Sequence, residues 1–236
     1  MKLFHDNNII AAFSDAGDGD LALYKMPDEQ VKLLWNSLPV VGQYDLALPT
    51  YGHQVHEARI MPVEADTASL LAGEADGVIT GLTDRPVGVF SADCLPLLIY
   101  ADEAVAAVHA GWRSTCLNIA GQAVSQFSAQ YGIAAAALRV YIGPCIGKCC
   151  LEMGDEVFEQ FVAVDRQWQQ FFVRRGRWHL NMRALNRWQL QQAGVLPDKI
   201  VDYDKCTFCR EGEYFSFRRQ RQHNGSMFSF VVRLNN

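Results

Sequence analysis

Residues 91–112 read SADCLPLLIYADEAVAAVHAGW and contain two apolar runs separated by a short acidic break. Each run has the length of a strand, and a nearly continuous apolar composition is typical of a strand that is buried on both faces. A two-residue turn at Ala101 and Asp102 would join the runs into a hairpin. The stretch therefore predicts a buried antiparallel pair with Cys94 at one end and His109 at the other.

The register of this hairpin brings the cysteine and the histidine together. With a two-residue turn, Tyr100 pairs with Glu103 and Cys94 lies opposite His109. Directly opposed residues have Cβ atoms about 4.5–5.5 Å apart on one face. A thiolate and an imidazole at this distance can share a metal ion or form an activated Cys–His pair. The alternative is that both are core residues, since a free cysteine is often buried. Pro96 would need an edge or outward-facing position.

A third histidine in GHQVHEARI, residues 52–60, can complete a metal site. We expect a strand over 53–63, on which His53 and His56 point to opposite faces, so only one of them can join a given site. One cysteine and two histidines leave a position of a tetrahedral zinc site open, as in catalytic zinc sites. Alternatively, both histidines are ordinary surface residues.

Length, charge and cysteine content limit the class of protein. We expect a single domain over residues 1–236 with a substantial core. The formal charge is −5 and no block of Lys or Arg precedes the C-terminal region, which argues against a nucleic-acid binder. No apolar run approaches the roughly 18 residues of a membrane span, and polar residues 5–8 interrupt any signal-peptide core. We expect the seven cysteines to be reduced and the protein to be cytoplasmic.

The other elements are expected to mix without a regular strand–helix alternation. The pattern predicts strand, turn and strand over 9–26, further strands at 77–80, 86–92 and 138–144, and an antiparallel pair from 214–219 and 227–234. Helices are predicted at 28–38, within 113–132 with a glycine stop, at 154–164 and at 182–193. This order favours an α+β fold, with mixed β-sheets flanked by helices.

Seven motifs occur together in an order that resembles one known family. They are QVH (54–56), ADG with VIT (75–80), SADCLPLL (91–98), VHAGWR (108–113), IGPCIGKCCLEMG (142–154), DKCTFC (204–209) and YFSFRR (214–219). From about residue 50 onward the chain is similar to the laccase-domain, YfiH-type family. Its members were first called multicopper polyphenol oxidoreductases. They are now described as purine nucleoside phosphorylases with adenosine deaminase activity.

The resemblance implies a metal site, usually of zinc and sometimes of copper. Carried across, its ligands are His56, Cys94 and His109, which selects His56 over His53. The implied fold is an α+β arrangement of mixed sheets and helices, shared with cysteine-hydrolase-like proteins. In the family an opening segment similar to STR-x-GGVS contributes an arginine, whereas this chain reads FSDAGDGD there. Glu57 also replaces a usual glycine, and the segment between Cys94 and His109 is shorter than usual.

Several polar residues are candidates for binding or catalysis. Arg113 is the first candidate for a phosphate contact, the alternative being a surface salt bridge. Asp93 is a candidate catalytic residue that orients a ligand histidine or acts as a general base, or it only caps a turn. We expect Gln54 and Arg218 to bind substrate; Arg218 and Arg219 would point to opposite faces of a strand, so at most one of them serves.

The remaining cysteines suggest a second site. CTFC is a CxxC motif, but CIGKCC is not a usual partner for it in a zinc ribbon. A structural metal is one interpretation of Cys145, Cys149, Cys150, Cys206 and Cys209. The other is a tight glycine-shaped loop close to the Cys–His site.

The working hypothesis is a metal-dependent purine nucleoside phosphorylase with adenosine deaminase activity. Its substrates would be phosphate and adenosine, inosine, guanosine or methylthioadenosine. One alternative is a metal-free hydrolase or amidase that uses Cys94 and His109 on a small amide or cell-wall precursor. A copper polyphenol oxidase is less favoured, because three ligands at one site do not hold the several coppers that reduce oxygen to water. A binding module without activity is the fourth interpretation.

Overall fold

The two apolar runs form the predicted hairpin. The computed structural model describes residues 1–67, 70–221 and 225–235. In it, strands β8 (Leu95–Tyr100) and β9 (Val105–Ala110) pair antiparallel, and every residue of both strands is buried. The predicted register is wrong by two residues, because the turn has four residues and the Ala101 amide donates to the Ala104 carbonyl at 2.9 Å. Tyr100 therefore pairs with Val105, and His109 faces Pro96 instead of Cys94.

The displacement by two residues leaves the two side chains on the same face. Side chains alternate with a period of two along a strand, so only an odd shift would have moved one of them to the other face. Pro96 lies inside the sheet, not at an edge. Gly143 continues the neighbouring strand, and its amide donates to the Pro96 carbonyl at 2.9 Å. The Gly143 carbonyl, which a proline cannot bond, accepts from Arg183 Nη1 at 3.1 Å. A side chain thus supplies a donor that proline lacks.

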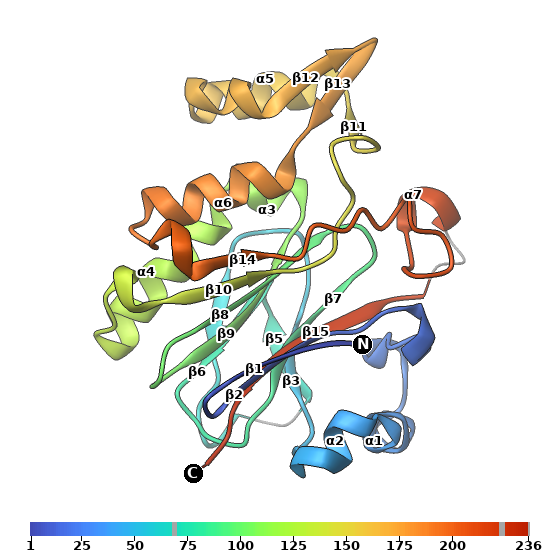
Figure 1. Ribbon diagram of the computed structural model, residues 1–236, viewed down its shortest axis with the longest axis vertical. Helices are drawn as coiled ribbons and strands as arrows, with labels where there is room; N and C mark the ends of the chain where they lie inside the picture. Colours follow the sequence, from blue (N-terminus) through green and yellow to red (C-terminus); the bar gives the residue numbers. More distant parts are fainter. Residues whose placement is uncertain (68–69, 222–224, 236) are drawn as a thin grey trace.

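Two six-stranded sheets stack face to face (Figure 1). The first has the strand order β1-β2-β15-β7-β3-β5 and the second β14-β10-β8-β9-β6-β4. The bounds in the first sheet are β1 Lys2–Asp6, β2 Ile9–Phe13, β3 Thr50–His53, β5 Leu70–Glu74, β7 Val87–Ser91 and β15 Met227–Arg233. Those in the second, besides the hairpin, are β4 Ile60–Pro62, β6 Gly77–Thr80, β10 Arg139–Ile142 and β14 Ile200–Asp202. This mixed architecture confirms the predicted α+β class.

Helices cover the outer faces of both sheets. Helices α1 (Asp28–Ser37) and α2 (Pro39–Tyr44) pack on the first sheet, and α3 (Trp112–Cys116), α4 (Ile119–Tyr131) and α6 (Met182–Gln192) on the second. A three-stranded sheet, β11 (Glu152–Met153), β13 (Arg177–Leu180) and β12 (Phe172–Arg175), projects with α5 (Asp155–Val164) beyond the second sheet (Figure 1). Both sheets are thus covered on both sides, which explains the continuous apolar runs.

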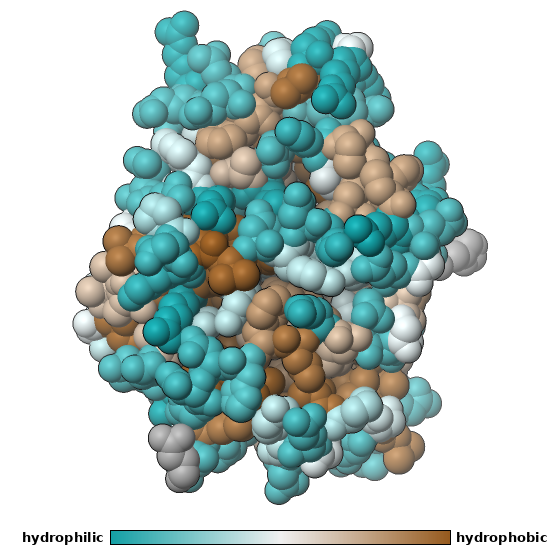
Figure 2. All heavy atoms as spheres, in the orientation of Figure 1, coloured by the Kyte–Doolittle hydropathy of each residue, from teal (hydrophilic) through white to brown (hydrophobic). Residues whose placement is uncertain are grey.

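The alternation along each strand divides the core into layers. In β8, Leu97 and Ile99 pack against the helices, whereas Leu98 and Tyr100 enter the layer between the sheets. Around this core, hydrophilic side chains cover most of the face shown in Figure 2. None of the helices within the described ranges has the length and apolar composition needed to cross a membrane.

Three of the predicted elements are wrong. Residues 53–63 form the end of β3, a loop and β4; the part of 9–26 beyond β2 forms two short 3-10 turns. Residues 214–219 hold no strand: Ser216 caps the short helix α7 (Phe217–Gln220), accepting from the Arg219 amide at 3.3 Å. Strand β15 pairs with β2 and β7. The predicted helix within 113–132 is divided into α3 and α4 at Asn118, and Gly132 ends it with a φ of 67°.

Candidate active site

The hairpin presents Cys94 and His109 at the edge of the layer between the two sheets. Cys94 lies four residues before Leu98 and His109 two residues after Ala107, so each shares the face of that residue. Leu98 and Ala107 point toward the first sheet. His56 comes from the other side, on the loop between β3 and β4, where its backbone φ is 63°. Strained backbone of this kind persists where the surroundings fix it. The site thus combines one residue from a loop that joins the two sheets with two residues from the hairpin of the second sheet.

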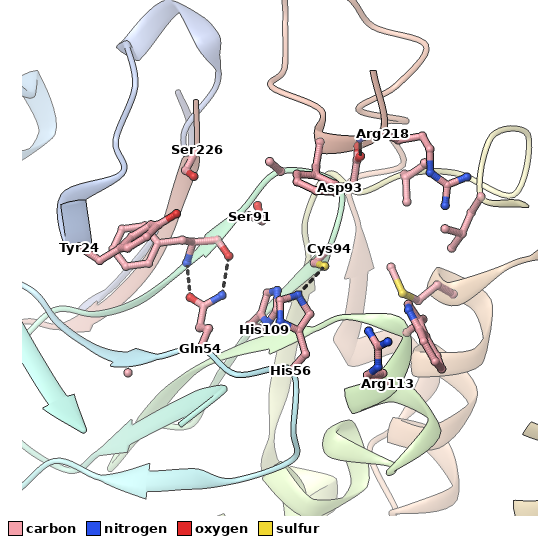
Figure 3. Close-up of a pocket in the computed structure, with 18 of the residues that line it drawn as sticks. Tyr24, Gln54, His56, Ser91, Asp93, Cys94, His109, Arg113, Arg218 and Ser226 are labelled. Atoms are coloured by element: carbon pink, nitrogen blue, oxygen red, sulfur yellow. Dashed lines mark hydrogen bonds between the residues drawn. The ribbon is translucent and has the colours of Figure 1, made fainter. Parts of the chain in front are cut away.

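The three side chains meet in one cluster (Figure 3). One ligand atom of each lies within 4.8 Å of the others, and Cys94 Sγ is 3.9 Å from His56 Nε2. The two imidazole rings are nearly perpendicular, with centroids 4.9 Å apart. His109 is buried, whereas His56 is exposed at the cavity.

Asp76, a residue without a predicted role, holds both histidines in place. Its carboxylate is fully buried and accepts from His109 Nδ1 at 2.8 Å. It also accepts the backbone amides of Val55 at 3.2 Å, His56 at 3.0 Å and Glu57 at 2.8 Å. The pairing of β6 with β9 creates this contact: Gly77 pairs with Val108, which puts Asp76 beside His109.

The charges of the cluster favour a thiolate in the metal-free protein. Burial opposes ionisation of Cys94, but the charge and hydrogen bond of His109, with those of His56, outweigh it and lower the pKa of the thiol to about 6. Burial also opposes protonation of His109, yet Cys94 and Asp76 together raise its pKa to about 9. For Asp76, burial would raise the pKa, but the hydrogen bond and charge of His109 lower it. Between these pH values Cys94 is a thiolate beside an imidazolium.

We expect the alkylation of Cys94 in metal-free protein to be fast and nearly constant above pH 7. Thiolate is the reactive form, so the rate should rise between about pH 5 and 7 as the thiol ionises and then level off. The rate constant with iodoacetamide, measured peptide by peptide with mass spectrometry, checks this. Cys116 is the control, because burial raises its pKa and its rate should still be rising above pH 8. A Cys94 rate that rises in parallel with that of Cys116 would contradict the assignment.

The cluster fits a zinc ion. Two ligands with bonds of about 2.3 Å to sulfur and 2.05 Å to nitrogen lie roughly 3.6 Å apart in a tetrahedron. The Cys94–His56 separation of 3.9 Å is close to this value. Because His109 Nδ1 donates to Asp76, its Nε2 is the nitrogen that would lose its proton and bind a metal, as in carboxylate–histidine–metal arrangements. The predicted set His56, Cys94 and His109 thus forms a cluster able to hold a metal.

Asp93 lies next to the cluster but does not orient a histidine. Its Oδ1 accepts from Thr207 Oγ1 at 2.6 Å, and its Oδ2 accepts from Ser216 Oγ at 3.0 Å and from the Arg218 amide at 2.7 Å. The carboxylate partner of His109 is Asp76, so that part of the prediction for Asp93 is wrong. Three donors keep this carboxylate occupied, and it fastens the C-terminal segment to the loop that carries Cys94.

Gln54 and the two C-terminal arginines have separate positions. The Gln54 amide bridges to β7, donating to the Phe90 carbonyl at 2.9 Å and accepting from its amide at 2.7 Å. Arg218 lines the cavity, whereas Arg219 donates to the carbonyls of Thr207, Phe208 and Tyr214. Both arginines lie within the short helix α7, where neighbouring residues point to different sides of the helix, and not on the predicted strand.

A cavity of about 630 Å³ opens beside the cluster. This volume is within the range of roughly 300–1,000 Å³ of small-molecule sites. Apolar and aromatic side chains form much of its wall: Tyr24, Phe90, Trp112, Ile146, Leu151, Met182 and Phe217. Four cations also line it: Lys25, Arg113, Arg218 and Arg221. Arg113 and Arg218 lie on one side of the cluster, and Tyr24 and Ser226 on the other (Figure 3).

Two lining residues have unused polar groups. Arg113 stacks on Trp112, with its guanidinium carbon 4.3 Å from the ring centroid, and forms no ion pair with another described residue. The surface salt bridge considered for Arg113 is therefore absent from the described part of the chain. Ser91 Oγ, a group without a predicted role, is buried without a hydrogen-bond partner among the described residues. Both groups are available to a ligand in the cavity.

Comparisons with known proteins identify relatives of this chain. A model of the family described as multi-copper polyphenol oxidoreductase laccase matches residues 23–234. Adenosine deaminase RL5, from an unknown prokaryotic organism, is 32% identical over 198 residues, which cover 80% of this chain and 75% of that protein. Purine nucleoside phosphorylase YlmD of Geobacillus stearothermophilus is 33% identical over 195 residues, covering 76% and 70%. The crystal structure of the hypothetical protein YfiH of Bacillus licheniformis superposes with a TM-score of 0.86 at 26% identity, covering 97% of this chain and 94% of that one.

Proposed function

Because the chain belongs to the laccase-domain, YfiH-type family, we propose that it is a metal-dependent purine nucleoside phosphorylase that also deaminates adenosine. The observation that carries the proposal is the His56–Cys94–His109 cluster at the wall of a cavity with both aromatic and cationic sides. The names of two relatives, an adenosine deaminase and a purine nucleoside phosphorylase, supply the two reactions.

The lining offers a place for each part of the substrates. The aromatic and apolar side chains suit the faces of a purine, and Ser91 Oγ can hydrogen-bond to its edge or to the ribose. Arg113 and Arg218 can hold phosphate by charge-assisted hydrogen bonds. The cavity thus has cations for phosphate although the opening segment lacks the arginine expected from the resemblance. Adenosine, inosine, guanosine and methylthioadenosine all share the purine and the sugar that this arrangement would bind.

The bond changes define what the residues must do. In phosphorolysis, a phosphate oxygen bonds to C1′ of the sugar while the bond from C1′ to the purine breaks and its electron pair leaves with the base. The arginines position the phosphate and balance its charge against the developing positive charge on the sugar. In deamination, water adds at C6 and ammonia leaves. Zinc held by His56, Cys94 and His109 would supply a Lewis acid that lowers the pKa of water toward about 7.

Product analysis tests the proposal. Zinc-loaded protein is incubated with adenosine or inosine, with and without inorganic phosphate, and the products are separated by chromatography and identified by mass. We expect free base and ribose 1-phosphate only when phosphate is present, and inosine from adenosine in either case. Absence of product from folded, metal-loaded protein under every condition would refute the proposed function.

Arg113→Gln should weaken phosphate binding selectively. Loss of one charge-assisted contact is worth about 1.5–3 kcal/mol, so KM for phosphate should rise roughly tenfold or more, with a much smaller change in KM for inosine. Initial rates against each substrate check this. Arg139→Gln is the matched control, because Arg139 pairs with Asp6 at 2.6 Å on a different surface and should leave both constants unchanged. An equal rise of both KM values would contradict a phosphate contact.

A metal-free cysteine hydrolase is the second candidate, favoured by one observation. Cys94, His109 and Asp76 resemble a catalytic triad of thiolate, imidazolium and carboxylate. Asp76 Oδ1 orients the imidazole by accepting from His109 Nδ1 at 2.8 Å. His56 separates the two functions, because a metal site needs it and a Cys–His nucleophile does not. His56→Ala that abolishes nucleoside turnover supports the metal enzyme. If an amide or ester substrate acylates Cys94 to a thioester, and His56→Ala does not change the extent of this acylation, the result supports the hydrolase.

We also propose zinc as the native metal and the cytoplasm as the location. All seven cysteines are free, which suits a reducing compartment. Copper and oxidoreductase activity rest on the family description alone. Full reduction of oxygen to water needs several coppers, whereas the described residues form only one metal-ligand cluster that contains histidine. Metal analysis of protein purified without added metal distinguishes zinc from copper.

A further inference from the structure

Two loops bring four cysteines together outside the active site. Strands β10 and β14 pair in parallel, so the chain leaves both at the same edge of the second sheet. The loop after β10 carries Cys149 and Cys150, and the loop after β14 carries Cys206 and Cys209. Their four sulfur atoms all lie within 4.8 Å of one another.

The spacing of the sulfurs is that of ligands around one ion. Cys149 Sγ is 3.6 Å from the sulfurs of Cys150, Cys206 and Cys209, and the sulfurs of Cys150 and Cys209 are 3.3 Å apart. A disulfide joins sulfurs at about 2.05 Å. Four bonds of about 2.3 Å in a tetrahedron place sulfurs roughly 3.8 Å apart. We propose that these four cysteines hold a structural zinc ion, separate from the His56–Cys94–His109 site.

The backbone around the cluster is shaped for thiolate ligands. The Gly147 amide donates to Cys206 Sγ at 3.2 Å, an outer contact that stabilises a ligating thiolate. A Cβ at Gly147 would lie 3.1 Å from Cys149 Sγ and 3.2 Å from Cys206 Cβ, so glycine lets the two loops approach. The Gly147 carbonyl also accepts the Cys150 amide at 2.9 Å, which closes the turn that presents the paired cysteines.

This cluster fastens the wall of the active site. Thr207, between the two cysteines of the CxxC motif, donates to Asp93 Oδ1 at 2.6 Å. From the other loop, the Ile146 amide donates to the Asp93 carbonyl at 2.9 Å. Asp93 directly precedes Cys94, so both cysteine loops hold the segment that carries the active-site thiol. The zinc would therefore stabilise the site without contacting substrate.

Metal counting in reduced protein tests the proposal without any assay of activity. Protein expressed with zinc is freed of loosely bound ions, and the metal per chain is measured by mass spectrometry after acid release. We expect Cys94→Ala to lose only the active-site ion and to retain the other. Cys206→Ser should lose the four-cysteine ion, and Cys116→Ser, in neither cluster, should lose none. Because no turnover is measured, failure of the proposed nucleoside reactions would leave this result intact.

Cobalt(II) identifies the ligands of the retained ion. Cobalt-loaded Cys94→Ala should show the intense sulfur-to-metal charge-transfer and tetrahedral bands of a four-thiolate site. If Cys206→Ser does not fold, this spectrum alone decides the matter. Cys94→Ala that retains no tightly bound metal when reduced, or binds cobalt without thiolate bands, would overturn the proposal. So would disulfides among the four cysteines in protein purified with zinc.

Discussion

Cys94→Ala should abolish both reactions and release the active-site metal while the protein stays folded. Structural zinc sites bind with about 10–16 kcal/mol shared among four ligands, so losing one ligand costs on the order of 3 kcal/mol. That is about a 100-fold loss of metal affinity. Cys94 lies partly exposed at the cavity, so its truncation leaves little buried void. We therefore expect turnover to fall by at least about 100-fold at limiting zinc, with the melting temperature of metal-free protein nearly unchanged.

The measurement pairs a zinc titration, followed by a chromophoric competitor, with product analysis at each zinc concentration. Cys116→Ala is the matched control, because this buried cysteine belongs to neither cluster and the variant should keep both affinity and turnover. Turnover of Cys94→Ala restored by excess zinc would identify the cysteine as a ligand only. Full turnover at wild-type zinc concentrations would remove Cys94 from the active site altogether.

The proximity of Cys94 and His109 could be predicted because it depends on the alternation of side chains along the two strands. An error of two residues in the register does not change the face to which they point. The apolar runs identified β8 and β9, and the wrong turn length moved the register by an even number of residues. His56 could not be placed in the same way, since it lies on a loop with positive φ and not on the expected strand. Only the resemblance of QVH to a known motif selected it over His53.

Residues that act through long-range contacts were the ones that sequence reasoning missed. Asp76 gains its role from the pairing of β6 with β9 and from a loop that folds back over its carboxylate. In YFSFRR the alternation predicted a strand, but Ser216 uses its hydroxyl to bond Asp93 and to cap α7. The CIGKCC and CTFC motifs meet only because β10 and β14 pair in parallel; Cys149 and Cys206 are 57 positions apart in the sequence. Local pattern carries no information on such contacts.

Asp76→Asn should weaken the metal site and the fold together. An asparagine has the same shape and keeps one acceptor oxygen. Its amide nitrogen, however, would face N–H groups that in the wild-type protein donate to the carboxylate, either those of the backbone alone or also that of His109. Loss of charge-assisted hydrogen bonds in a fully buried position costs about 3 kcal/mol of unfolding free energy. Loss of the carboxylate behind a ligand histidine lowers metal affinity about 10–100-fold. Chemical denaturation and the same zinc titration measure both.

A readout at His109 separates positioning from general destabilisation. In wild-type protein the His109 Nδ1 proton, held on Asp76 and shielded from solvent, should give a slowly exchanging downfield proton resonance. We expect Asp76→Asn to shift or remove this resonance at a temperature where the variant is fully folded. Asp165→Asn is the control, because Asp165 caps a surface turn at Gln167 and asparagine caps equally well, so stability and zinc affinity should hold. If Asp76→Asn lost stability yet kept wild-type zinc affinity and the His109 resonance, Asp76 would support the loop alone, and the orientation of the ligand histidine would have to come from the packing of β9.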